Sequence, residues 1–248
     1  MSPMNPKSIR VCLSPALLPF YKQEDTIAVV IDIFRATSCM CYGLANGARA
    51  IIPVAELDEC LAYQSNGHLL AAERDGQVVT GFDFGNSPFS YTREKVAGKT
   101  VVLTTTNGTQ AIQQCRNAHT LVIGSFLNIS VLTDWLKQQP RHLLLVCAGW
   151  KNQFSLEDTV FAGALVHRLK THFGELDDAA YAAESLYLEG HNDLAAYLGK
   201  ASHSKRMQHL HITQDISFCL QEDIVSVIPM LKGDELVPLT LPLPDLLQ

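Results

Sequence analysis

The sequence predicts an α/β protein in which helical layers cover both faces of a mixed, mostly buried sheet. Two observations point to this fold class. Short apolar runs rich in β-branched residues have the length and composition of buried strands. Small or polar residues follow each run, and a helix-like segment comes after most of them, which is the rhythm of α/β proteins. The runs span residues 27–33, 50–54, 100–103, 120–123 and 143–146.

Four of these runs lead into expected helices, at residues 37–46, 109–117, 128–138 and 156–173. The tail from Ile228 to Leu247 differs because it contains four prolines. Proline disrupts helices and central strands, so we expect an extended, proline-rich C-terminal arm laid on the body. The chain has no internal repeat or low-complexity linker, and α/β units often reach this length, so we expect a single domain over residues 1–248.

Composition and charge narrow the class of partner. The 248 residues include 19 basic and 25 acidic side chains, a formal net charge of −6 without a basic stripe, so nucleic acid is not an expected partner. No apolar run has the length of a membrane span or a signal peptide, so we expect no membrane contact and a cytoplasmic location. The seven cysteines lie mostly in apolar segments without a Cys-x-x-Cys pair, which predicts buried free thiols. We also expect a homo-oligomer, a dimer.

The first polar cluster lies at the end of the first apolar run and contains Asp32, Arg35, Thr37 and Ser38. Ligands of open α/β sheets bind beyond the carboxyl ends of the strands, so this position favours a site. The Asp32 carboxylate is suited to magnesium, which prefers oxygen ligands, and Arg35 can form a fork onto phosphate or sulfonate. Thr37 or Ser38 would cap the next helix. The alternative is an Asp32–Arg35 pair that only fixes the turn.

The second cluster is Thr104-Thr-Thr-Asn-Gly-Thr109, between an apolar run and a helix. Consecutive amides at a helix start can bind an anion, and a glycine permits close backbone approach. The alternative is an Asn-Gly turn with threonine caps. Neither a Walker pattern nor Gly-x-Gly-x-x-Gly occurs, so no nucleotide is implied. The candidate substrate-binding residues here are Thr105, Thr106, Asn107, Gly108 and Thr109.

The third cluster, Ser155-Leu-Glu157-Asp158, has the form of a helix start. Ser155 is the expected N-cap, and Asp158 occupies the capping-box position with Asp in place of Glu. Two adjacent carboxylates at a sheet end could also hold a metal or a water, but they point about 100° apart around a helix. If one of these carboxylates caps the helix, at most one of the two, the other, is a direct metal ligand.

Two further groups complete the candidates. A loop rich in glycine, asparagine and proline follows Glu73 and contains Asp83, and long ordered loops of this kind often carry function. Ser125 and Asn128 follow another strand end and either donate to a ligand or only cap a helix. His203, His209 and His211 cluster in a polar segment, which favours solvated side chains, although one could carry protons.

Several motifs together resemble the 2-phosphosulfolactate phosphatase (ComB) family. They occur in the order Val-Ile-Asp-x-x-Arg-Ala-Thr, Glu-Arg-x-Gly, Gly-Phe-Asp-x-Gly-Asn-Ser-Pro, Thr-Thr-Thr-Asn-Gly-Thr, Gly-Ser-Phe-x-Asn, Val-Cys-Ala-Gly and Phe-Ser-Leu-Glu-Asp-Thr. The resemblance runs from about Val29 to Asp223. The sequence departs from the usual family pattern at Thr37-Ser-Cys39 and at His203-Ser204, which bears on the identity of the substrate more than on the class of reaction.

The resemblance implies a magnesium-dependent phosphatase. Such an enzyme hydrolyses (2R)-phospho-3-sulfolactate, a small polyanion, to 3-sulfolactate and phosphate on the route to coenzyme M. We assign catalytic roles to Asp32, Arg35 and Glu157, and metal binding to Asp32, Glu73 and Asp158. Either a metal-activated water or a carboxylate attacks phosphorus, and the residue types do not distinguish the two. A non-catalytic protein that binds organic phosphates or sulfonates is the alternative. A nucleotide-binding Rossmann enzyme is disfavoured because its glycine-rich turn is missing.

Overall fold

The computed structural model describes residues 7–210 and 212–240. Within these residues eleven strands form one mixed sheet in the order β5-β4-β6-β3-β11-β10-β7-β2-β8-β1-β9. The bounds are β1 Ser8–Cys12, β2 Thr26–Ile31, β3 Ala50–Pro53, β4 Leu69–Arg74, β5 Gln77–Val78, β6 Thr100–Thr104, β7 Thr120–Gly124, β8 His142–Cys147, β9 Glu175–Leu176, β10 Pro229–Lys232 and β11 Glu235–Pro238.

All five strands expected from the sequence are present, with ends that shift by at most two residues. The central strand β2 pairs in parallel with β7 on one side and β8 on the other. Its last residue, Ile31, lies opposite Gly124 of β7 and Cys147 of β8. The loops that follow these three strands therefore leave the sheet side by side, at the edge where α/β proteins bind ligands.

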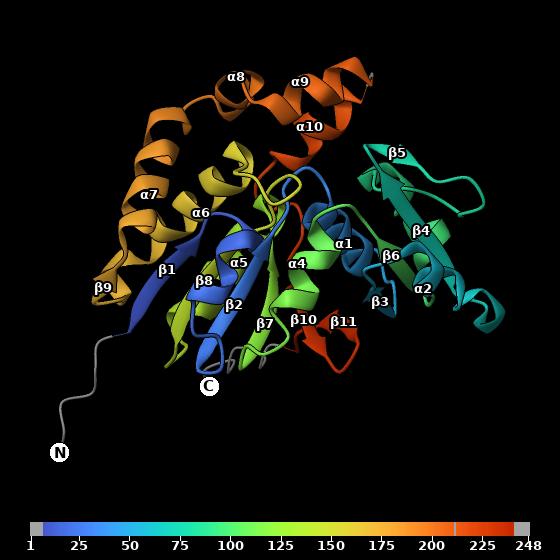
Figure 1. Ribbon diagram of the computed structural model, residues 1–248, viewed down its shortest axis with the longest axis horizontal. Helices are drawn as coiled ribbons and strands as arrows, with labels where there is room; N and C mark the ends of the chain where they lie inside the picture. Colours follow the sequence, from blue (N-terminus) through green and yellow to red (C-terminus); the bar gives the residue numbers. More distant parts are fainter. Residues whose placement is uncertain (1–6, 211, 241–248) are drawn as a thin grey trace, which may run out of the picture.

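Alternate residues of β2 face two separate cores, as the two-residue period of a strand requires. Ile27 and Val29 belong to one apolar cluster, which also contains buried residues of α5, α6 and α7. Ala28 and Val30 belong to the other, with residues of α1 and α4. Helices thus cover both faces of the sheet (Figure 1). The predicted layered α/β/α fold is confirmed.

The helices expected from the sequence correspond to α1, α4, α5 and α6. A further group, α8 to α10, crosses one end of the sheet above the carboxyl end of β2 (Figure 1), and we call these three helices the cap. The α-helices of the described residues are α1 Ala36–Ala45, α2 Leu57–Leu61, α3 Arg93–Val96, α4 Gly108–Gln114, α5 Ile129–Lys137, α6 Leu156–Leu169, α7 Asp178–Gly190, α8 Leu194–Gly199, α9 Ser202–His209 and α10 Thr213–Cys219.

The described part of the C-terminal segment is extended, as predicted, but it belongs to the sheet rather than lying on the body. Strands β10 and β11 form an antiparallel hairpin inserted between β7 and β3. Pro229 and Pro238 face each other at the open ends of this hairpin, where a missing amide interrupts no interior ladder bond. The rest of the expected arm, residues 241–248, lies outside the described residues.

Two other expectations concern the cysteines and the membrane. All seven cysteines are buried free thiols, as predicted. Across residues 7–210 and 212–240, no helix combines the length and the apolar character that crossing a membrane requires.

Candidate functional site

A pocket lies at the carboxyl end of β2, beneath the cap. Asp32 and Arg35, from the loop after β2, line it together with Glu73 at the end of β4. Asn107 contributes from the loop before α4, and His203 from α9 of the cap. Segments far apart in the chain thus bring carboxylates, a guanidinium, an amide and an imidazole to one place.

Asp32 is buried, with 7% of its surface exposed, and it lies in the loop just before α1. The hydrogen bonds between Asp32 and Thr37 use the Asp32 backbone, which leaves the carboxylate to the pocket. Burial raises the pKa of Asp32 to about 6, the charge of His203 opposes this rise, and the charge of Glu73 adds to it. Two carboxylates thus repel each other in this pocket.

Gly108 allows this position of Asp32. A Cβ atom at Gly108 would lie 2.6 Å from Oδ2 of Asp32 and 2.7 Å from the Cβ of Ala36. Such distances are too short for any side chain, so a residue other than glycine would push the Asp32 loop away. Gly108 therefore allows close packing at the site. The sequence predicts substrate contact for this glycine, whereas the structure shows it in contact with the Asp32 loop.

Arg35 is buried, and the carboxylate that pairs with it is that of Asp215 rather than Asp32. Its Nη1 donates to the carboxylate of Asp215 on α10, and its Nη2 donates to the carbonyl of Gly76 at 3.2 Å. Arg35 is therefore held by Asp215 and Gly76, and not by the Asp32–Arg35 pair that was the alternative interpretation of the sequence. Asp215 links the sheet end to the cap, and this ion pair positions the guanidinium in the pocket wall.

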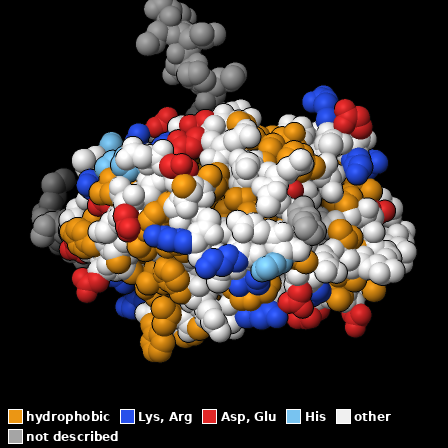
Figure 2. Space-filling model, turned by 90° about the horizontal axis from the view of Figure 1, so that it is seen from above, with side chains coloured by type: hydrophobic (Ala, Val, Ile, Leu, Met, Phe, Trp, Pro, Cys, Tyr) orange, Lys and Arg blue, Asp and Glu red, His pale blue; other side chains and the backbone are white. Residues whose placement is uncertain are grey.

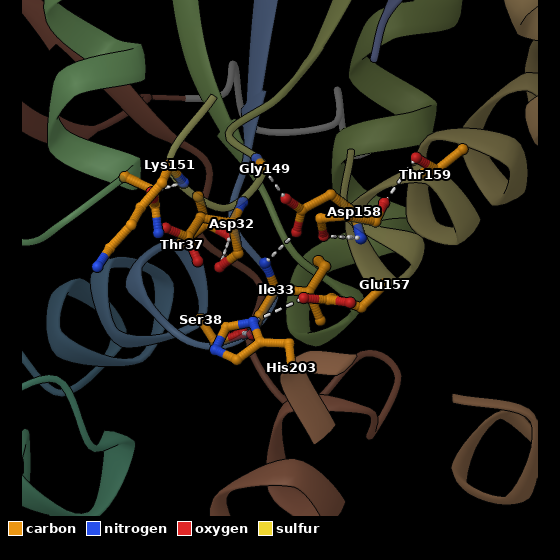
Figure 3. Close-up of polar contacts among 12 residues, drawn as sticks. Asp32, Ile33, Thr37, Ser38, Gly149, Lys151, Glu157, Asp158, Thr159 and His203 are labelled. Carbon is orange, nitrogen blue, oxygen red and sulfur yellow. Dashed lines mark hydrogen bonds and ion pairs between the residues drawn. The ribbon is translucent and has the colours of Figure 1, made fainter. Parts of the chain in front are cut away.

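Asp158 joins two of the loops that form the site. Its Oδ1 accepts a hydrogen bond from the Ile33 amide at 2.9 Å, and its Oδ2 accepts one from the Gly149 amide at 3.0 Å (Figure 3). Ser155 is the N-cap of α6, as expected, and its Oγ accepts from the Asp158 amide at 3.4 Å. Burial, with the neighbouring charges of Glu157 and Asp32, raises the pKa of Asp158. Its two oxygens tether backbone and Asp158 does not line the pocket, so metal binding by Asp158 stays a prediction.

Glu157 points toward the cap, where its Oε1 lies 2.7 Å from Nδ1 of His203 (Figure 3). Burial acts to raise the pKa of Glu157, but the hydrogen bond and charge of His203, together with hydrogen bonds from the Glu157 backbone and Ser155, outweigh burial, so the pKa is lowered. The His203 ring packs against Phe34 and Trp150, with centroids 6.0 Å and 5.3 Å away. Glu157 and these rings fix the imidazole beside the pocket.

Glu73 is buried, and its carboxylate accepts hydrogen bonds from the Gly76 amide and, at 3.5 Å, from the amide and hydroxyl of Thr106. It lines the pocket with Asp32. Asp83, in the same loop region, instead accepts the Leu70 amide at 2.7 Å and supports the fold.

Most donors of the threonine-rich segment are engaged within the protein. Thr105 and Thr109 hydrogen-bond each other through hydroxyls and backbone, as in the alternative of threonine caps. Asn107 reaches the pocket, and its Oδ1 accepts the Lys151 amide at 2.8 Å. Of the five candidate substrate-binding residues in this segment, the structure places Asn107 in the pocket wall.

Ser125 and Asn128 are fully buried in a capping box of the short 3-10 helix Phe126–Asn128, which leads into α5. Asn128 accepts the Ser125 amide and donates to the carbonyls of Ile123 and Val227. The Ser125 hydroxyl lies 3.0 Å from that of Ser38. Neither Ser125 nor Asn128 lines the pocket, so we assign them to the scaffold.

Sequence reasoning did not place three residues of the cap at the site: His203, Arg206 and Asp215. They sit on α9 and α10, and no strand end in the sequence leads to them. The histidine cluster was the available signal. His203 enters the pocket wall, His209 lies exposed at the end of α9, and His211 falls outside the described residues.

Seen from the side of the cap, basic, acidic and apolar side chains are interspersed over the surface (Figure 2). Charged side chains of both signs gather in the pocket, which is lined by the carboxylates of Asp32 and Glu73 and the guanidinium groups of Arg35 and Arg206. Fold and site together define an α/β protein with a buried pocket of carboxylates and guanidinium groups at the carboxyl ends of its strands. Such a pocket suits the binding of an anion together with a cation.

Comparison with known proteins identifies the family. The family described as 2-phosphosulpholactate phosphatase matches residues 12–234. A protein of Thermotoga maritima named probable 2-phosphosulfolactate phosphatase is 43% identical over 215 residues, which cover 87% of this chain and 93% of that protein. Proteins of the same name are 40% identical in Caldanaerobacter subterraneus, covering 85% and 89%, and 38% identical in Synechocystis, covering 87% and 92%. The chain belongs to the 2-phosphosulpholactate phosphatase family, a family of phosphoric monoester hydrolases.

Proposed function

We propose that this protein is a magnesium-dependent phosphatase that hydrolyses 2-phospho-3-sulfolactate to 3-sulfolactate and phosphate. Family membership and the names of the relatives support the reaction. The observation that carries the assignment to this pocket is the Asp32 carboxylate. It is buried at a strand end, keeps its oxygens for the pocket, and shares that pocket with Arg35 and Glu73.

The donor set of the pocket fits magnesium in part. No three His, Cys, Asp or Glu side chains of the described residues form a ready cluster for a metal. Magnesium, however, commonly binds through one or two carboxylates together with water and substrate phosphate. Asp32 and Glu73 would supply these carboxylates, and a cation would relieve the repulsion between them. When bound, the ion would polarise the phosphoryl oxygens and lower the pKa of a coordinated water.

The other groups of the pocket have roles that follow from their contacts. Arg35, held by Asp215, would stabilise the charge that develops on the equatorial oxygens of the phosphoryl group. His203 binds Glu157 through Nδ1, which leaves Nε2 to hold a proton for the leaving oxygen. In this proposal Glu157 acts through His203, and Asp158 holds the Asp32 loop in place.

Phosphate release from a panel of phosphoesters, measured with magnesium or with EDTA, tests the proposal. We expect release from 2-phospho-3-sulfolactate with magnesium and its loss in EDTA. Tight binding of the phosphoester without release would instead favour a non-catalytic binding protein. Release that is undiminished in excess EDTA would remove the metal from the proposal and leave the phosphatase.

The wider context stays a prediction from the sequence. It comprises a place on the route to coenzyme M, a cytoplasmic location and a homodimer. Sedimentation equilibrium of the purified chain tests the homodimer, because it reports the mass of the assembly directly.

A further inference from the structure

The guanidinium of Arg206, a residue of the pocket wall, has an unused hydrogen-bonding edge. Arg206 lies on α9 of the cap and lines the same pocket as Asp32 and Arg35. Its Nε and Nη2 atoms are both buried, and neither has a hydrogen-bond partner among the described residues. Leaving a buried donor unsatisfied costs free energy, and the cost is greater for a charged group. Two such donors on one side chain indicate a ligand that binds there.

The two free donors belong to the same edge of a planar group. Nε and Nη2 direct their N–H bonds in parallel, which matches two oxygens of one carboxylate, sulfonate or phosphate. The guanidinium carbon lies over the Trp150 ring, 4.2 Å from its centroid, a cation–π contact that holds the group in place. Trp150 is itself held, because its backbone exchanges two hydrogen bonds with Gln153. The edge is therefore preorganised for a bidentate contact.

No acidic side chain of the pocket satisfies this edge. Glu157 is the carboxylate whose charge acts on Arg206, but its Oε1 is bound to His203. Glu73 accepts hydrogen bonds from Gly76 and Thr106. Burial lowers the pKa of Arg206, and the charge of Glu157 offsets this only in part.

Arg35 and Arg206 therefore differ in what they offer a ligand. Arg35 is engaged by the Asp215 carboxylate and the Gly76 carbonyl, and it follows Asp32 by three residues. Arg206 comes from the cap and keeps one whole edge free. A substrate with one anionic group near Asp32 and a second group reaching toward the cap would use both arginines.

We propose that Arg206 determines substrate specificity by binding, through its Nε and Nη2 edge, an anionic group of the substrate that is not transferred. This inference rests on the proposed function, whose substrate carries a sulfonate and a carboxylate beside its phosphate. Both groups present the paired oxygens that the edge requires, and the experiment distinguishes them.

The first test is thermal unfolding of the ligand-free Arg206→Met protein. Methionine keeps the apolar contact with Trp150 and removes a buried charge that has no partner, so the melting temperature should stay the same or rise. A matched Arg116→Met variant removes an exposed arginine just after α4 that pairs with Asp234 and does not line the pocket. If Arg206→Met lowers the melting temperature by several degrees more than Arg116→Met, Arg206 is structural and the proposal is overturned.

The second test is calorimetric binding of 3-sulfolactate, which does not depend on turnover. We expect Arg206→Met to weaken binding by roughly 10- to 100-fold, because a bidentate charged contact is lost. Arg116→Met should bind like the wild type. Equal binding by all three proteins, or no binding by the wild type, overturns the proposal.

The third test compares kcat/KM for three phosphoesters. These are 2-phospho-3-sulfolactate, 2-phospholactate, which lacks the sulfonate, and 1-sulfopropan-2-yl phosphate, which lacks the carboxylate. The loss of kcat/KM caused by Arg206→Met should largely disappear for the ester that lacks the group bound by Arg206. For the full substrate, the loss should appear mainly as a higher KM. The same penalty for all three overturns the proposal. If the wild type hydrolyses none of them, the proposed function fails, while unfolding and calorimetry still decide the role of Arg206.

Discussion

The carboxylate of Asp158 accepts a 2.9 Å hydrogen bond from the backbone amide of Ile33, the residue after Asp32. Its second oxygen accepts the amide of Gly149 in the loop after β8. Gly149 has a positive φ of 64°, and a Cβ there would lie 2.2 Å from the Gln153 carbonyl, so this loop depends on glycine. One side chain on α6 thus sets the spacing of two loops that form the pocket.

Replacement of Asp158 by Asn should therefore lower stability and activity together. The amide nitrogen of asparagine cannot accept a hydrogen bond, so one buried backbone amide loses its partner, at a cost of about 2–3 kcal/mol in the free energy of unfolding. Urea unfolding measures this cost. Ser155→Ala is the control, since loss of the N-cap should cost about 1 kcal/mol and leave activity largely intact. An Asp158→Asn protein as stable as the wild type would contradict the tethering role.

Gly108→Ala should reduce activity because its new methyl group must displace the Asp32 carboxylate, which would lie 2.6 Å away. We expect kcat/KM to fall by at least about tenfold, since small displacements of reacting groups have large effects on rate. Gly199→Ala is the matched control, because a Cβ at Gly199 meets no atom within 4 Å. Equal activity of the two variants would show that Asp32 need not stay where the structure places it.

Arg35→Lys should impair turnover although the positive charge remains. A lysine ammonium cannot bind Asp215 and the Gly76 carbonyl in the geometry of a fork while also facing the substrate. The loss in transition-state stabilisation should be roughly 2–4 kcal/mol, the size found for removal of one oxyanion donor. Steady-state kinetics against Arg116→Lys, a substitution outside the pocket, measure it. A near-normal kcat/KM for Arg35→Lys would reduce Arg35 to a structural partner of Asp215.

The stability of the α6–α7 pair should depend on pH through Glu184. Its carboxylate contacts Lys170 at 2.6 Å and His167 at 2.8 Å. Burial acts to raise the pKa of Glu184, but these two partners outweigh burial, so the pKa falls below its usual 4.5. A lowered carboxyl pKa stabilises the fold above pH 4.5, and this contribution is lost as the pH falls through the folded-state value. Glu184→Gln should thus cost more stability at pH 7 than at pH 3, as measured by urea unfolding. An equal cost at both pH values would refute the ion-pair account.

The sequence predicted the parts of the site that follow strands. Asp32, Arg35 and Glu73 each come at or just after a strand end, and the parallel strands carry them to one edge. The cap could not be predicted in this way. The helices that carry His203, Arg206 and Asp215 are placed above the sheet by tertiary packing. No local sequence pattern shows that these helices reach the site.

Local spacing also cannot separate a cap from a ligand contact. Ser125 and Asn128 occur after a strand end like the pocket residues, yet their side chains turn back to the chain and satisfy each other. The sequence did not predict the strands β10 and β11, for a different reason. Their prolines indicate irregular chain by local rules, whereas Pro229 and Pro238 stand at strand ends that tolerate a missing amide.

Magnesium-dependent release of phosphate from 2-phospho-3-sulfolactate by Asp32→Asn, measured beside the wild type, tests the central claim most directly. Asn preserves size and removes one of two carboxylates that repel each other, so the variant should fold with an unchanged or higher melting temperature. If Asp32 is the carboxylate on which the chemistry depends, kcat/KM should fall by at least about a thousandfold. A folded Asp32→Asn protein that releases phosphate at a rate near that of the wild type would contradict the account.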